Sequence, residues 1–137
     1  MISILIAGNE NNKLAGFLKG LEHDKEVKIY QAGNLEEAFH TISTTNLDLV
    51  VAGENISDIS GISFAEKIVS INPMINCAVV SSLSPENFHE ATEGLGLLMQ
   101  LSVDADASQA NTLVNRLKEV LNLTSKSRLC TEGVVKS

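Results

Sequence analysis

Residues 47–61 read Leu47-Asp-Leu-Val-Val-Ala-Gly-Glu-Asn-Ile-Ser-Asp-Ile-Ser-Gly61. The segment Leu47 to Ala52 is mainly apolar, as expected of a strand that is buried on both faces in a parallel sheet. The following loop, Gly53 to Gly61, carries Glu54, Asn55 and Asp58. Apolar residues then recur at helical spacing until Pro73, which ends the helix. The stretch therefore predicts a strand, a polar loop and a helix, in that order.

The same order recurs on both sides of this stretch. Apolar runs predict further strands at 2–7, around Val27 to Tyr30, at 77–80 and at 97–103. Helices are predicted between them from apolar residues at helical spacing. The predicted N-cap of the first helix is Asn9 or Asn11, and that of the second is Asn34, with Glu37 completing a capping-box-like pattern. Ser84 before Pro85 is the predicted N-cap of the fourth helix, and Ser108 that of the last.

The fourth predicted helix is the weakest. Phe88, Ala91 and Leu95 are its anchors, and Gly94 and Gly96 interrupt it at a cost of about 1 kcal/mol each. The last helix has the clearest period and ends near residue 123. Residues 1–123 are predicted to form one domain, and the polar, aperiodic residues 124–137 a flexible C-terminal tail or linker.

Strands that alternate with helices predict an α/β fold with right-handed crossovers and helices on both faces of a parallel sheet. Five such units predict a three-layer αβα sandwich of the flavodoxin-like type, with strand order 2-1-3-4-5. A site in such a sheet lies at the carboxyl ends of the strands. The positions to inspect are therefore Gly8 to Glu10, Gly53 to Asn55, Ser81 to Ser82, and the segment after Val103.

Charge and composition narrow the classes of partner. The formal net charge of -7 gives a negative surface field that repels nucleic acid and anionic lipid. No apolar run of bilayer length and no signal-peptide pattern occurs, so we expect a cytoplasmic protein that does not bind membranes. Cys77 lies in an apolar run and is expected in the core, and neither it nor Cys130 has metal-ligand spacing.

The stretch Asp48 to Gly61 resembles the third strand and following loop of the receiver domain of two-component response regulators, and the resemblance covers about residues 1–122. It implies a phosphate-accepting aspartate after strand three, two acidic Mg²⁺ ligands after strand one, a hydroxyl residue after strand four and a lysine after strand five. Here the phosphoacceptor position falls on Gly53, the acidic pair on Gly8 and Asn9, and the hydroxyl on Ser81. Residues 94–115 contain no Lys or Arg. The chain therefore resembles a degenerate receiver, or pseudoreceiver, without a catalytic or metal site.

This resemblance leaves three hypotheses for function. The first is a non-catalytic regulatory module that has no cofactor. It would bind a signalling protein, or form a homodimer, through the face of helix four, strand five and helix five. The second is a small-ligand sensor that uses the space around Gly8, Gly53 and Ser81. The third is an atypical phosphoacceptor in which Glu10, Glu54 or Asp58 acts as a surrogate, although strand alternation points Glu54 to the opposite side unless the loop bulges.

Overall fold

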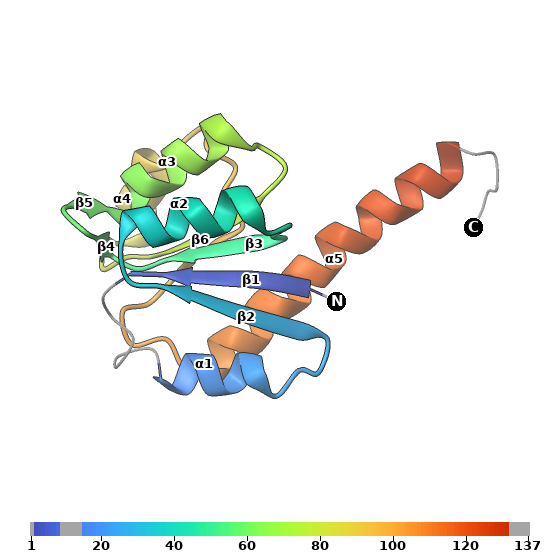
Figure 1. Ribbon diagram of the computed structural model, residues 1–137, viewed down its shortest axis with the longest axis horizontal. Helices are drawn as coiled ribbons and strands as arrows, with labels where there is room; N and C mark the ends of the chain where they lie inside the picture. Colours follow the sequence, from blue (N-terminus) through green and yellow to red (C-terminus); the bar gives the residue numbers. More distant parts are fainter. Residues whose placement is uncertain (1, 9–14, 132–137) are drawn as a thin grey trace.

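A five-stranded parallel sheet forms the centre of the protein (Figure 1). The computed structural model describes residues 2–8 and 15–131, with side chains up to residue 121. The strands are β1 (Ile2–Ala7), β2 (Val27–Ala32), β3 (Leu49–Ala52), β6 (Asn76–Val80) and β7 (Met99–Leu101), in the order β2-β1-β3-β6-β7. Because β4 and β5 lie outside this sheet, the order is the predicted 2-1-3-4-5, and the α/β prediction is confirmed.

Helices cover both faces of the sheet and make two separate cores. On one face, α1 (Ala15–Glu22) and α5 (Ala107–Thr131) pack Phe17, Leu21, Leu113 and Leu117 onto the sheet. On the other face, α2 (Leu35–Thr44), α3 (Gly61–Ile71) and α4 (Pro85–Ala91) bury Ile42, Phe64, Ile68 and Phe88. Figure 1 shows the same three layers. Successive strand residues point to opposite faces, so one strand supplies both cores.

The predicted caps are correct at two of the helices that the structure describes. The Asn34 side chain accepts the Glu37 backbone N–H at 2.8 Å, and Glu37 Oε1 accepts the Gly33 N–H at 2.9 Å. Ser84 Oγ accepts the Asn87 N–H at 3.3 Å. The prediction for α5 is wrong, because Asp106 Oδ1 accepts the Gln109 N–H at 3.2 Å and Ser108 lies inside the first turn. Asn9 and Asn11 lie outside the described residues.

The fourth helix is short, as its sequence predicts. It has seven residues and buries Phe88, but Ala91 is exposed and is not an anchor. Gly94 and Gly96 follow it with φ of +87° and +65°, a backbone conformation that disfavours other residues. Strand β7 is also short: it pairs with β6 only over Met99 to Leu101, not over the whole predicted range 97–103.

The last helix is longer than predicted. It runs from Ala107 to Thr131, so residues 124–131 are helical and not an irregular tail, and Figure 1 shows this part projecting beyond the sheet. The apolar stripe ends near residue 121, yet no Gly or Pro occurs between 107 and 131. Helix propagation adds a hydrogen bond per residue and does not itself require packing. In the described part of the chain, no helix has both the length and the apolar character needed to cross a bilayer.

Candidate functional site

The carboxyl ends of β1 and β3 meet at two glycines. Gly53 donates its backbone N–H to Ala7 O at 2.7 Å, and Gly8 donates its N–H to Ala32 O at 3.0 Å. Both residues are buried. A Cβ built on Gly8 would lie only 3.2 Å from Gly53 Cα and 3.4 Å from the Asn55 carbonyl oxygen. The two positions therefore adjoin, as predicted, but their backbones fill the space between them.

A third glycine completes this contact. A Cβ on Gly61 would overlap the carbonyl oxygen of Gly53, while the Gly61 N–H donates to the Glu54 carbonyl at 2.9 Å. We call Gly8, Gly53 and Gly61 the glycine cluster. Because a Cβ on Gly61 would overlap Gly53 O and one on Gly8 would lie 3.2 Å from Gly53 Cα, these two glycines leave little room for a side chain of their own.

Ser81 directly follows β6 and is 7% exposed. Its Oγ accepts the Leu83 N–H at 3.1 Å, and Gln100 Nε2 on β7 donates to Ser81 O at 3.3 Å and to Leu83 O at 2.8 Å. The Ser81 to Leu83 turn is therefore tied to the neighbouring strand. Sequence reasoning missed Gln100, although a polar residue within an apolar strand was the signal for it.

Glu54 ties the same turn from the other side. Its Oε2 accepts the Ser82 N–H at 2.9 Å, so its carboxylate lies toward the end of β6. Alternation was predicted to point Glu54 to the opposite side unless the loop bulges; β3 ends at Ala52, so the strand period does not extend to Glu54. A cavity of about 310 Å³ lies between the two loops, and Glu54, Asn55, Ser81 and Ser82 are among the residues that line it.

Of the other predicted acidic residues, Asp58 is the one that the structure describes. Asp58 is exposed in the two-residue turn between β4 (Asn55–Ile56) and β5 (Ile59–Ser60), a hairpin that the sequence reading did not predict. Ser57 precedes it with φ of +54°. Asn9 and Glu10 lie outside the described residues. Within residues 2–8 and 15–131, no three His, Cys, Asp or Glu side chains are grouped as a metal ion requires.

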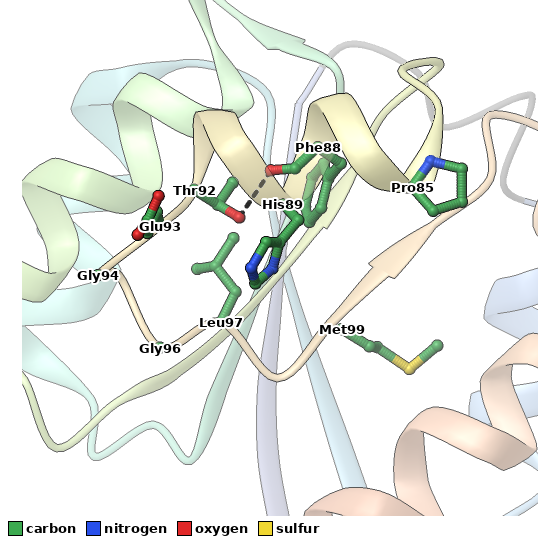
Figure 2. Close-up of a pocket in the computed structure, with 9 residues that line it drawn as sticks. All are labelled: Pro85, Phe88, His89, Thr92, Glu93, Gly94, Gly96, Leu97 and Met99. Atoms are coloured by element: carbon green, nitrogen blue, oxygen red, sulfur yellow. Dashed lines mark hydrogen bonds between the residues drawn. The ribbon is translucent and has the colours of Figure 1, made fainter.

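A second hollow lies at the far edge of the sheet, between α4 and β7 (Figure 2). We call this cavity of about 580 Å³ the α4 groove. Apolar side chains from both elements line it, together with the backbone after α4; the lining residues are Pro85, Phe88, His89, Thr92, Glu93, Gly94, Gly96, Leu97 and Met99. Thr92 Oγ1 donates to the Phe88 carbonyl at 2.8 Å, which keeps the buried hydroxyl satisfied.

Cys77 lies on β6 between these two regions. It is 2% exposed, which confirms the prediction that it belongs to the core. Burial raises the pKa of its thiol to about 12, because the charged thiolate is disfavoured away from water. His23, His40 and His89 are all exposed and lie on or after three different helices, in agreement with the sequence reading.

Solved structures share this architecture. A receiver domain protein from Methanospirillum hungatei matches with a TM-score of 0.74 and 17% identity, over 93% of this chain and 98% of its own. A two-component response regulator from Clostridium difficile matches with a TM-score of 0.73 and 20% identity, over 89% and 99%. A Francisella response regulator receiver domain gives 0.74 and 20%, over 88% and 99%. The chain has the fold of a response regulator receiver domain.

No protein-family model and no curated protein matches the sequence. The likeness to receiver domains therefore lies in the fold, at identities of 20% or below for these three structures. The positions predicted from the resemblance do lie at the carboxyl edge of the sheet, where Gly8, Gly53 and Ser81 directly follow β1, β3 and β6. The function of Gly8, Gly53 and Ser81 therefore depends on the chemistry of these residues themselves.

Proposed function

We propose that this chain is a non-catalytic signalling module, a receiver-like fold that acts by binding another protein and not by accepting phosphate. The observation that carries the proposal is Gly53, which follows β3 where the fold's chemistry needs a carboxylate. A nucleophilic carboxylate cannot be supplied by a residue without a side chain. A Cβ on Gly53 would meet its neighbours only at ordinary van der Waals distances, the nearest being Ala7 O at 3.4 Å, so it is the residue type and not crowding that removes the carboxylate.

The residues that the structure describes at this edge do not fit a divalent cation either. Mg²⁺ prefers carboxylate oxygens in a near-octahedral arrangement. Gly8 and Gly53 offer only backbone, and the Glu54 carboxylate accepts the Ser82 N–H. We therefore derive no phosphoryl-transfer step for this chain.

Mass spectrometry tests this proposal directly. The full chain is incubated with acetyl phosphate and Mg²⁺, and its intact mass is then measured. The expected result is an unchanged mass, since neither Gly53 nor Glu54 acts as an acceptor. An adduct of one phosphoryl group that disappears in Glu54→Gln would instead establish the atypical phosphoacceptor.

The cavity of about 310 Å³ beside Ser81 favours one second candidate, a small-ligand sensor. Its lining combines the Glu54 carboxylate with the hydroxyls of Ser60, Ser81 and Ser82, which can bind a polar molecule. A thermal-shift screen over polar metabolites tests this candidate, with Ser81→Ala as the variant that should lose any shift. If no compound raises the melting temperature of the wild type, the sensor hypothesis is rejected.

Protein binding would use the face of α4, β7 and α5. The α4 groove supports this, because Phe88 and Leu97 line it and it lies at the edge of the sheet. As a cytoplasmic module, the chain would meet its partner there without membrane or nucleic acid. Its net negative charge repels nucleic acid and anionic lipid.

A further inference from the structure

A separate groove lies between α2 and α3, toward the C-terminal ends of both helices. Its cavity measures about 640 Å³, and the residues that line it are Phe39, His40, Ile42, Ser43, Ile71 and Asn72. The Phe39 ring packs edge-on against the buried Phe64 ring, with centroids 5.4 Å apart, so an aromatic pair holds the two helices together. Figure 1 shows α2 and α3 on the same face of the sheet. We call this cavity the α2–α3 groove.

Large apolar side chains are exposed where α3 ends. Ile71, the last residue of α3, lines the groove and is 61% exposed. Met74, in the loop that follows, is 81% exposed. Among the side chains that the structure describes, the remaining large apolar residue of this kind is Leu83, at 40%. Exposed apolar side chains beside a hollow are typical of a surface that another molecule covers.

The groove is built from uncharged stretches of sequence. Residues 38–47 and 68–85 contain no Asp, Glu, Lys or Arg, although the whole chain has 17 acidic and 10 basic residues. All the lining residues fall within these two stretches. One helical turn before the groove, α2 carries Glu36 and α3 carries Lys67, which are both exposed and opposite in sign. On a chain of net charge -7, this surface is therefore neutral in sum.

We propose that the α2–α3 groove is a contact between two copies of this chain, in which α2 of each copy lies against α3 of the other. A two-fold contact places the same surface of both subunits face to face, so a charge near its axis meets its own copy. An uncharged groove avoids that repulsion, and Ile71 of each copy enters the groove of the other.

The charges at the rim fit this arrangement. With α2 opposite α3, Glu36 of one copy faces Lys67 of the other, and the symmetry repeats the pair on the other side of the axis. An apolar centre with charges confined to the rim is also the usual composition of homodimer interfaces. A second copy therefore matches both the apolar and the charged parts of this surface.

This contact goes beyond the proposed function and does not depend on it. The α2–α3 groove shares no lining residue with the α4 groove. A dimer formed here therefore carries two copies of the proposed partner-binding face. A partner with two matching sites would bind such a dimer more tightly than it binds one copy.

Sedimentation equilibrium of the full chain tests the contact. We expect the mass to rise from 14.7 kDa toward twice that value as the protein concentration increases from about 1 µM to about 1 mM. Ile71→Glu should weaken the dimer at least tenfold, because it places a carboxylate in an apolar contact. Leu83→Glu is the matched control: it makes the same change at an exposed apolar residue outside the groove, and it should alter the dimer constant less than twofold.

A charge swap at the rim tests how the helices are arranged. Glu36→Lys places a lysine opposite Lys67 and should weaken the dimer about fivefold. The same change lowers the magnitude of the net charge by two, from -7 to -5, so general repulsion between chains would predict tighter association instead. Glu36→Lys combined with Lys67→Glu restores opposite signs at an unchanged net charge and should return the dimer constant to within twofold of the wild type.

Three outcomes overturn the proposal. A monomer at every concentration means that no second copy occupies the groove. Equal effects of Ile71→Glu and Leu83→Glu place the contact elsewhere, and a double variant no tighter than Glu36→Lys excludes the arrangement of α2 against α3. Circular dichroism confirms that each variant is folded. The acetyl phosphate experiment does not depend on any of these results, so the dimer and the non-catalytic function fail separately.

Discussion

Glycines build two opposite environments at opposite ends of the strands, one after β1 and β3 and one before β7. After β1 and β3, a Cβ added to Gly61 would overlap the Gly53 carbonyl oxygen, and one added to Gly8 would lie 3.2 Å from Gly53 Cα. After α4, a Cβ on Gly94 or Gly96 would meet nothing within 4 Å. In the first region the missing side chains close the edge, whereas in the second positive φ angles turn the chain and leave a groove open. A vacated side-chain position is therefore not by itself a cavity.

Strand β6 separates the two regions, and the reactivity of Cys77 reports whether this strand becomes accessible to solvent. With a pKa of about 12 against an ordinary 9.0, its thiolate at pH 8 is about a thousandfold scarcer than that of an exposed thiol. In the variant Cys130→Ser, Cys77 is the remaining cysteine. We expect a thiol reagent to label this variant at least a thousandfold more slowly when it is folded than when it is unfolded in concentrated urea. Rapid labelling of the folded chain would show that the open region extends into the core.

Gly61→Ala should cost the largest amount of stability among single changes at the glycine cluster. Its methyl group would overlap the Gly53 carbonyl, and the rigid backbone there has little room to move. We expect the free energy of unfolding to fall by about 3 kcal/mol in urea denaturation. A smaller loss of unfolding free energy than in Gly94→Ala would contradict the close packing of Gly61 against Gly53.

Gly94→Ala separates backbone strain from crowding. At φ of +87° the methyl group is disfavoured by the backbone alone, since no neighbour lies within reach. Denaturation should therefore show a smaller loss, of about 1.5 kcal/mol. A loss as large as that of Gly61→Ala would mean that the turn after α4 is packed and not open.

Glu54→Ala tests the tie between the closed edge and the turn that precedes α4. The change removes the acceptor of the Ser82 N–H, and the expected loss is about 1 kcal/mol because water reaches this exposed amide. Amide hydrogen exchange should be faster at Ser82 and should stay slow in Glu54→Gln, which keeps an acceptor oxygen. Unchanged exchange in Glu54→Ala would show that Gln100 alone holds the turn.

The smallest effect is expected far from both glycine regions, at the ion pair of Asp24 and Lys118. Their side chains meet at 2.8 Å. The hydrogen bond from Lys118, followed by that from the Glu26 N–H, lowers the pKa of Asp24 below 3.8, and the bond to Asp24 raises the pKa of Lys118 above 10.5. Both groups are solvent-accessible, so the pair adds little to the free energy of unfolding.

The two shifts fix the sign of the pH dependence. The contribution of Asp24 is fully present above pH 3.8 and is lost as the pH falls through its lowered folded value. The contribution of Lys118 is fully present below pH 10.5 and is lost as the pH rises through its raised value. Asp24→Asn should therefore lower the melting temperature slightly at neutral pH and have no effect at strongly acidic pH. A difference that persists in acid would contradict this assignment.

The sequence alone predicted the class of fold, the order of the sheet and the caps at Asn34 and Ser84. These features follow from local periods and side-chain chemistry, which a linear reading captures. It also placed Gly8, Gly53 and Ser81 at one edge, since parallel strands end together. It did not predict the length of α5 or the hairpin of β4 and β5, because the first has no apolar stripe beyond residue 121 and the second has only two residues per strand.

What only the tertiary structure decided is where space remains. A glycine in the sequence is compatible with close packing, as at Gly61, and with an open groove, as at Gly96, because the atoms that fill or spare the position come from other elements. The direction of Glu54 was decided in the same way, by a Ser82 amide 28 residues along the chain. Local pattern specifies which element forms, but contacts distant in sequence determine what each edge of the sheet can bind.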